Sequence, residues 1–280
     1  MEKKQSPETS APIGVFDSGV GGLTVASQLF ETLAFEDVVY FGDVGRTPYG
    51  PRSKDIIIEF TRQDVAFMME QGVKFIICAC NSASSVALDE IAGDFDVEMV
   101  GVIEPGARAA VEKTKNGRVG VIGTQATINS NAYARIIHQS DPEIKVFSLA
   151  CPLFVPLVEE GYVDKKAAYL IAEDYLQTMK DVQIDTLVLG CTHYPLLKNV
   201  ISIVMGDMVN LIDSGEETAR VARQRLTDGN LLNPRSSQSP TVAGERKFFV
   251  SDVPEKFSQI ASRFLGHRVD RITRVDISKY

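Results

Sequence analysis

The sequence predicts an α/β protein made of two related halves, each with a parallel sheet. Short apolar runs alternate with stretches of helical period, and this alternation is typical of βαβ units. Most of the runs are continuously apolar, as expected for strands that helices cover on both faces. Similar elements also recur in the same order at a nearly constant offset of about 110 residues, which indicates an internal repeat.

The apolar runs give the predicted strands, and the helical period gives the helices between them. Eight strands are predicted: Ile13–Phe16, Val38–Phe41, Phe75–Ala79, Val97–Val102, Val119–Ile122, Ile144–Phe147, Thr186–Leu189 and Val209–Ile212. Apolar stripes predict helices over roughly 54–71 and 165–180. The segment 247–266 predicts one more strand and helix.

The repeat sets the predicted domain organisation. Segment 73–81 aligns with segment 184–193, so that Cys80 falls on Cys191. The strand and helix predicted within 205–228 follow the completed second half, and we expect them to return to the first domain. The predicted first domain is therefore discontinuous, and the full set of ranges is 12–98 plus 209–280 for the first domain, 99–208 for the second, 1–11 as a flexible tail and 232–245 as a loop or linker.

Composition narrows the class of protein. The 280 residues are 44% hydrophobic and 24% charged, an ordinary globular balance. The formal charge of −8 and the lack of a basic block argue against binding to nucleic acid or to an anionic membrane surface. No apolar run reaches the ~18 residues of a membrane span, and the polar start does not resemble a secretory signal. Four cysteines are too few for a disulfide scaffold, so we expect a cytoplasmic protein with reduced thiols.

Four loops follow predicted strands, where open α/β sheets bind ligands. They are DSGVGG (17–22), GDVGRTPYG (42–50), CNSAS (80–84) and CTHYP (191–195). The first could cradle an anion with its backbone N–H groups, or it could be only a tight turn before a helix. It matches neither of the common glycine-rich nucleotide motifs.

The thiols are the most informative feature. Cys80 and Cys191 each follow a strand at matched positions of the repeat, where helix N–H groups favour a thiolate. Two acid/base groups on opposite sides of one carbon suit stereochemical inversion, whereas one thiol with a histidine suits acyl transfer. We interpret Cys78 and Cys151 as buried core residues. A metal site is disfavoured, because the cysteine spacing lacks a second ligand pair and the chain has three histidines.

Several neighbours of the thiols have two interpretations each. His193 could tune Cys191 or be a hydrogen-bonded loop histidine, and Asp17 could act on Cys80 or cap a helix. Glu159 could lie near the second thiol or in a solvated acidic loop. Tyr49 and Gly50 could line a pocket or form a plain turn.

Taken together, the motifs DSGVGGLTV, VVYFGD, PYGPRS, ACNSAS, GT-x-AT at 123–127 and GCTHYPLL resemble those of bacterial glutamate racemases. They run in order from residue 13 to about 228. The resemblance implies two similar flavodoxin-like domains related by pseudo-two-fold symmetry, with the active site in the cleft between them. It also implies interconversion of L- and D-glutamate without cofactor or metal, supply of D-glutamate for peptidoglycan, and a homodimer.

The resemblance further implies roles for individual residues. Cys80 and Cys191 match the two catalytic cysteines, which Asp17, Glu159 and His193 would assist. The implied substrate contacts are Asp17, Ser18, Tyr49, Gly50, Asn81, Ser82, Thr124, Thr192 and His193. Ser82 departs from the threonine usual in the family, but it keeps the hydroxyl donor.

Three alternatives to glutamate racemisation stay open at this point. The first is a racemase for aspartate or another small amino acid. The second is a thiol amidase or hydrolase that uses Cys191 and His193 and tolerates loss of Cys80. The third is a binding protein whose two lobes close on a small ligand.

Overall fold

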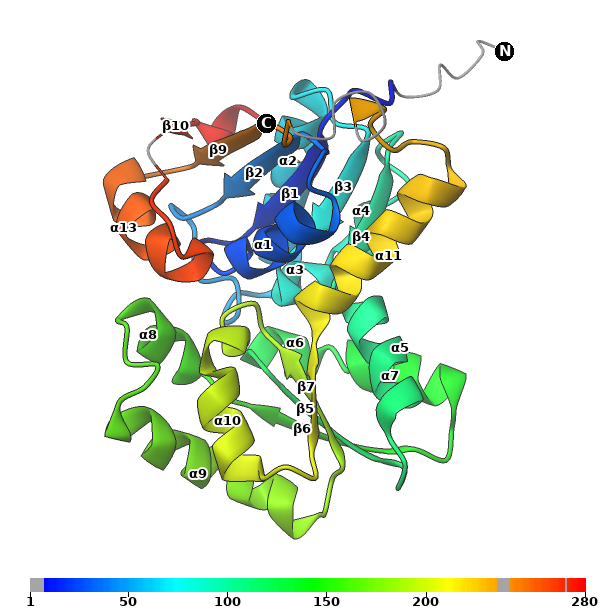
Figure 1. The fold of residues 1–280 in the computed structure, drawn as a ribbon, viewed down its shortest axis with the longest axis vertical. Helices are drawn as coiled ribbons and strands as arrows, with labels where there is room; N and C mark the ends of the chain where they lie inside the picture. Colours follow the sequence, from blue (N-terminus) through cyan, green and yellow to red (C-terminus); the bar gives the residue numbers. More distant parts are fainter. Residues whose placement is uncertain (1–7, 236–241, 270) are drawn as a thin grey trace.

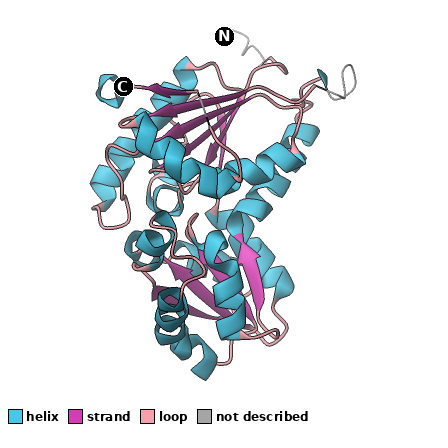
Figure 2. Ribbon diagram, turned by 60° about the vertical axis from the view of Figure 1, so that its left-hand side comes forward, coloured by secondary structure: helices cyan, strands magenta, loops and turns pink. Residues whose placement is uncertain are grey.

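The computed structural model describes residues 8–235, 242–269 and 271–280. The chain forms two lobes, one above the other in Figure 1, and each is a parallel sheet with helices packed on it (Figure 2). The predicted α/β class with two parallel-sheet domains is confirmed. Most of the predicted tail (1–7) and part of the predicted linker (236–241) lie outside the described residues.

The first lobe contains a six-stranded sheet in the order β10-β9-β2-β1-β3-β4. Its strands are β1 (Ile13–Asp17), β2 (Val38–Gly42), β3 (Phe75–Cys78), β4 (Glu98–Gly101), β9 (Arg246–Val250) and β10 (Ile272–Arg274). Every residue of β1, β2 and β3 is buried, as continuous apolar runs predict for central strands. The edge strand β10 was not predicted, because its three residues carry no apolar run.

The second lobe contains a four-stranded sheet in the order β6-β5-β7-β8. Its strands are β5 (Arg118–Gly123), β6 (Lys145–Ala150), β7 (Thr186–Gly190) and β8 (Asn210–Asp213). This order repeats β2-β1-β3-β4 of the first lobe, which confirms the internal repeat. The repeat puts the loop after β3 and the loop after β7 at equivalent positions, and these loops carry Cys80 and Cys191.

Helices fill both faces of the sheets and link the lobes. Those of the first lobe are α1 (Leu23–Thr32), α2 (Lys54–Glu70), α3 (Asn81–Val86), α4 (Leu88–Ile91), α11 (Ser214–Asp228), α13 (Pro254–Leu265) and the short η2 (Ile277–Lys279). Those of the second are α5 (Ile103–Lys113), α6 (Gln125–Asn129), α7 (Ala132–Ser140), α8 (Phe154–Glu159), α9 (Lys166–Asp181), η1 (Tyr194–Leu197) and α10 (Lys198–Met205). The two helices predicted by period, α2 and α9, form within one residue of the predicted bounds.

The chain crosses between the lobes twice, after β4 into α5 and after β8 into α11. β4 pairs with β3, and β8 pairs with β7. The predicted ranges put residues 99–101 in the second domain and 209–213 in the first, and strand pairing reverses both assignments. A short apolar run does not reveal which strand it pairs with. The hydrophobic pattern alone therefore assigned most of β4 and all of β8 to the wrong domains. Helix α11 does return to the first lobe, where it packs on α1.

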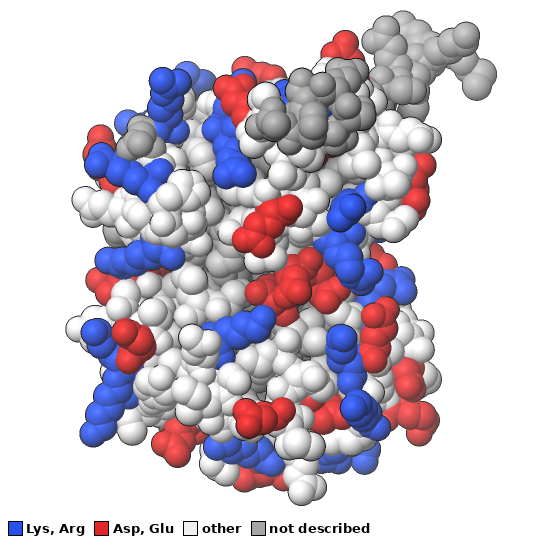
Figure 3. Space-filling view, in the orientation of Figure 1, with Lys and Arg blue, Asp and Glu red and all other residues white. Residues whose placement is uncertain are grey.

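The surface carries charges of both signs. On the face in Figure 3, Lys and Arg are interspersed with Asp and Glu and do not gather in one patch. Across the described ranges, no helix has both the length and the apolar character needed to cross a bilayer.

Candidate active site

A cavity of about 260 Å³ lies between the lobes, and both Cys80 and Cys191 line it. Each thiol comes from a different sheet, Cys80 after β3 and Cys191 after β7. The carboxyl ends of the two sheets therefore face one another across this cavity, the arrangement that the resemblance to glutamate racemases implied. Of the other candidates from the sequence, the lining includes Ser18, Tyr49, Gly50, Asn81, Ser82, Thr124, Glu159, Thr192 and His193.

Cys80 is held at the start of α3. Its carbonyl accepts the amide of Ser84 at 2.8 Å, and its thiol donates to Ser18 Oγ at 3.4 Å. The side chain is almost completely buried. Burial, and after it the nearby carboxylate of Asp17, raises the pKa of the Cys80 thiol to about 12, although the Ser18 hydroxyl opposes the shift. At neutral pH this sulfur is therefore protonated.

Asp17 lies behind the cavity and is not part of its lining. It ends β1 and is buried, and its Oδ2 accepts the amide of Gly19 at 2.9 Å. Its Oδ1 has no hydrogen-bond partner among the described residues. Burial raises the pKa of Asp17, while the charge of His193 and the amides of Gly22 and Gly19 oppose that shift. The carboxyl group thus influences Cys80 through charge and does not face the cavity.

The second thiol has a histidine and a carboxylate in line with it. Cys191 Sγ lies 3.8 Å from His193 Nδ1, and His193 Nε2 lies 3.0 Å from Glu159 Oε1. Burial lowers the pKa of His193, but its hydrogen bonds to Cys191 and Glu159 and its electrostatic interactions with both outweigh burial and raise the pKa to about 10. His193 is therefore an imidazolium at neutral pH. Glu159, at the end of α8, is a partner of this histidine and does not lie in a solvated loop.

Hydrogen bonds connect the two lobes beside the cavity. The hydroxyls of Ser82 and Thr124 share a bond of 3.0 Å, and the amide of Ala126 donates to Gly50 O at 3.1 Å. Thr24 donates its hydroxyl to Thr192 O at 2.9 Å. These bonds join segments of opposite lobes that flank the two thiols.

Two glycine-rich loops permit this close approach. A Cβ on Gly21 would lie 2.2 Å from Thr192 Oγ1, and a Cβ on Gly50 would lie 3.0 Å from Thr124 Cβ. The DSGVGG loop therefore packs directly on the loop that carries Cys191. Gly50 has the pocket-lining position that was one of its two predicted interpretations.

The hydroxyl of Tyr49 is engaged away from the substrate space. It donates to Asp43 and lies 3.0 Å from Asp64 Oδ2, and all three side chains are buried. Burial, and then the charges of Asp64 and Asp43, raises the pKa of Tyr49 well above its usual value. This network fixes the turn that presents Gly50 to the second lobe.

The other two thiols are structural, as predicted. Cys78 and Cys151 are fully buried, their sulfurs lie near backbone carbonyls, and neither lines the cavity. All four cysteines are free. Within the described part of the chain, no cluster of three or more His, Cys, Asp or Glu side chains is placed to hold a metal ion.

Sequence reasoning missed part of the lining. The residues it did not single out are Thr47, Pro48, Pro51, Gln125, Pro152, Val155 and Pro156. The last three follow β6, whose carboxyl end lies beside that of β5. Applying the strand-end rule to this strand as well would have found them.

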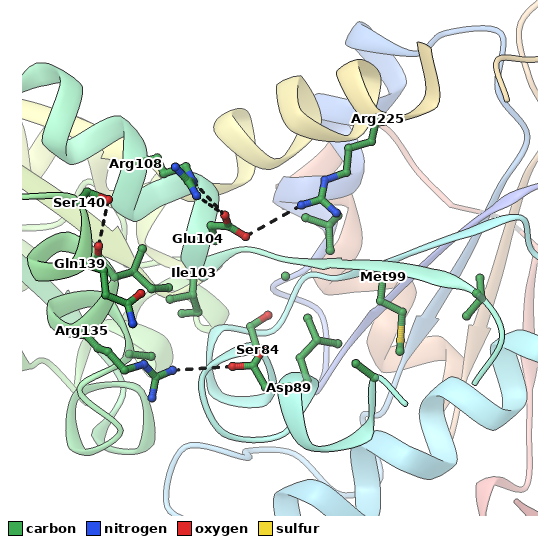
Figure 4. A pocket seen from close by; sticks show the side chains of 17 residues that line it. Ser84, Asp89, Met99, Ile103, Glu104, Arg108, Arg135, Gln139, Ser140 and Arg225 are labelled. Carbon is green, nitrogen blue, oxygen red and sulfur yellow. Dashed lines mark hydrogen bonds and ion pairs between the residues drawn. The ribbon is translucent and has the colours of Figure 1, made fainter. Parts of the chain in front are cut away.

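A larger cavity, of about 880 Å³, lies elsewhere between the lobes, beside α5, α7 and α11 (Figure 4). Its arginines are paired with carboxylates: Arg108 with Glu104 at 2.8 Å, and Arg135 with Asp89 at 3.8 Å. Arg225 pairs with Glu98 at 3.0 Å. No thiol or histidine is among the residues that line this cavity.

A family model and individual relatives assign the chain to the same protein family. The family model described as Asp/Glu/Hydantoin racemase matches residues 50–222. The glutamate racemase of Geobacter metallireducens is 47% identical over 265 residues, which cover 95% of this chain and 96% of that protein. The glutamate racemase of Syntrophus aciditrophicus is 47% identical over 274 residues, covering 98% of this chain and 99% of that protein.

Solved structures agree with this assignment. The crystal structure of glutamate racemase from Francisella tularensis in complex with D-glutamate superposes with a TM-score of 0.89 at 39% identity, covering 97% of this chain and 100% of that one. The glutamate racemase isoform RacE1 of Bacillus anthracis gives a TM-score of 0.90 at 38% identity, covering 96% and 98%. The chain therefore belongs to the Asp/Glu/Hydantoin racemase family of isomerases, and the members that it resembles over almost its entire length are glutamate racemases.

Proposed function

We propose that the chain interconverts L- and D-glutamate by a two-base mechanism in which Cys80 and Cys191 act on opposite faces of the α-carbon. The observation that carries the proposal is that both thiols, from equivalent places in two lobes, line one cavity. The relatives named as glutamate racemases, and the neighbour solved with D-glutamate, support glutamate as the substrate.

The mechanism moves one proton from carbon to sulfur and another from sulfur to carbon. The thiolate of one cysteine takes the α-proton and becomes a thiol, which leaves a carbanion at the α-carbon. The thiol of the other cysteine then gives its proton to the opposite face and becomes a thiolate. The carbon ends inverted, and both protons are accounted for by the two sulfurs. No cofactor or metal is needed for this sequence of steps.

The groups around each thiol support different resting roles for Cys80 and Cys191. Cys80, with a pKa near 12, is a proton donor in the resting site. His193 is charged and can donate Nδ1–H to the sulfur of Cys191 while Nε2–H bonds Glu159. The hydroxyls of Ser18, Ser82, Thr124 and Thr192 and the amide of Asn81 offer hydrogen-bond donors for the two carboxylates of a dicarboxylic amino acid.

Incubating the purified, chelator-treated protein with D-glutamate in deuterated water tests the proposal. We expect L-glutamate to form with deuterium at the α-carbon. Competing D-aspartate in the same tube separates a glutamate racemase from an aspartate racemase. Absence of both inverted product and α-deuterium with either amino acid would show that the two thiols serve another reaction.

We further propose that the protein is a cytoplasmic homodimer that supplies D-glutamate for peptidoglycan. The resemblance to bacterial glutamate racemases supports this role, and the four free cysteines fit a reducing compartment. Analytical ultracentrifugation would report the oligomeric state. Rescue of a D-glutamate-requiring bacterial strain would test the metabolic role.

A further inference from the structure

Tyr133 of α7 reaches from the second lobe to the residue that follows Cys80. Its phenol donates to Asn81 Oδ1 at 2.8 Å, and both side chains are buried. Asn81 is the first residue of α3, and it lines the thiol cavity. Tyr133 itself does not line that cavity. The bond therefore connects a residue outside the cavity to one inside it.

The ring of Tyr133 also packs against the other thiol-bearing segment. A Cβ on Gly190, the residue before Cys191, would lie 3.1 Å from Tyr133 Cε2. A Cβ on Gly106 of α5 would lie 3.3 Å from Tyr133 Cε1. One side chain thus contacts the end of the strand before Cys191 and bonds the residue after Cys80. Its ring is confined on both sides, so the phenol oxygen has a fixed position.

The bond decides which way the Asn81 amide faces. The phenol of Tyr133 donates its hydrogen bond to the side-chain oxygen of Asn81. The side-chain nitrogen of Asn81 therefore points away from the phenol. Asn81 Nδ2 is buried and has no hydrogen-bond partner among the described residues. A buried donor without a partner is costly and rare in native structures. Because Asn81 lines the cavity, an acceptor on a bound ligand is the natural partner for this nitrogen. A carboxylate, which only accepts hydrogen bonds, fits it.

We propose that Tyr133 is a positioning residue, which holds Oδ1 of Asn81 so that Nδ2 is presented to a carboxylate of the substrate. The inference rests on the proposed racemisation of a dicarboxylic amino acid. Burial raises the pKa of Tyr133, so the phenol keeps its proton and remains a donor through the neutral range. Without that donor the Asn81 amide can turn over and direct its oxygen at the substrate, where it repels a carboxylate.

Tyr133→Phe removes the hydroxyl and keeps the ring that packs on Gly190. We expect KM for both glutamate enantiomers to rise about tenfold with kcat within about twofold, because the contact binds ground state and transition state alike. In an Asn81→Ala background, Tyr133→Phe should have no further effect on KM, since the two residues act through one contact. As a matched control, Tyr194→Phe removes another buried hydroxyl, which donates to Cys151 O at 2.8 Å. Its effect and that of Asn81→Ala should simply multiply.

Other results would overturn the inference. These are an unchanged KM in Tyr133→Phe, a fall in kcat alone, or losses that multiply with those of Asn81→Ala. Asn81→Asp gives a second probe that leaves Tyr133 intact: it puts an oxygen where Nδ2 was, so calorimetry should show D-glutamate binding weakened at least tenfold. Undiminished binding by Asn81→Asp would also refute the role. If the wild-type protein does not racemise glutamate at all, the proposed function fails first, and that result is separate from these comparisons.

Discussion

Nε2 of His193 and Oε1 of Glu159 lie 3.0 Å apart, so a carboxylate of α8 faces the histidine that stands beside Cys191. The two residues are separated in sequence by one helix, α9, one strand, β7, and the loops around them. This pair links the protonation state of His193 to Glu159, which also lines the cavity.

The His193–Glu159 pair predicts a pH dependence with a definite sign. Because folding raises the pKa of His193 from 6.5 to about 10, its contribution to stability is complete below pH 6.5 and is lost as the pH rises through about 10. Glu159→Gln should move the midpoint of His193 down towards 6.5. NMR titration of the imidazole signals measures the midpoint of His193, with the other two histidines as internal references. An identical midpoint in wild type and Glu159→Gln would contradict the assignment.

Replacing either cavity thiol should abolish racemisation and leave different partial reactions. We expect Cys80→Ser and Cys191→Ser each to lose at least ~10²–10⁴-fold in kcat. Each variant should still exchange the α-proton of one enantiomer with deuterated water, and the two variants should differ in which enantiomer that is. Cys151→Ser is the matched control, because that thiol is buried outside the cavity and its loss should leave both exchange reactions intact. The same surviving enantiomer in both variants would rule out thiols on opposite faces.

Gly21 should tolerate no side chain. A Cβ there would lie 2.2 Å from Thr192 Oγ1 and 2.5 Å from His193 Nδ1, so Gly21→Ala must displace the loop that carries Cys191. We expect kcat/KM to fall at least about tenfold, together with ~1–3 kcal/mol of stability from overpacking. Gly93→Ala is the control, because a Cβ at Gly93 meets nothing within 4 Å. Equal activity of the two variants in a racemase assay would show that the loops are not tightly apposed.

The hydroxyl of Ser82 should matter more than the methyl group that a threonine would add at this position. Ser82 and Thr124 share a hydrogen bond of 3.0 Å across the lobe boundary. Ser82→Thr keeps that hydroxyl and should stay within about twofold of wild type, whereas Ser82→Ala should lose about 2–12-fold in kcat/KM. Steady-state kinetics on both enantiomers provides the comparison. A Ser82→Ala variant as active as Ser82→Thr would mean that the hydroxyl is dispensable.

Much of the fold followed from local pattern. β1, β3, β5 and β7 are continuous apolar runs, and the repeat of their order predicted two similar sheets with a thiol after β3 and after β7. Pattern failed where the information was not local. Nothing in the run before Asp213 says that β8 pairs with β7, and β10 is too short to carry a period.

The same limit applies to the site. The internal repeat predicted Cys80 and Cys191 at equivalent strand ends of two separate sheets, and the resemblance to glutamate racemases implied one cleft between those sheets. The partners of those thiols lie far along the chain: Glu159 contacts His193 from α8, and Tyr133 contacts Asn81 from α7. The resemblance pointed to Glu159, whereas Tyr133 is an ordinary helical position in the sequence. Tertiary packing brings Glu159 into the lining of the cavity and Tyr133 against Asn81.

The double crossing between the lobes has a consequence for biosynthesis. The first sheet receives β9 and β10 after the whole second lobe has been made, and β9 pairs directly with β2. Until residues 246–250 leave the ribosome, the nascent chain therefore exposes the backbone of β2 as an open edge. The amino-terminal lobe is therefore the first to begin folding and the last to finish. During that interval the exposed edge of β2 is the part of the nascent chain that a chaperone would shield.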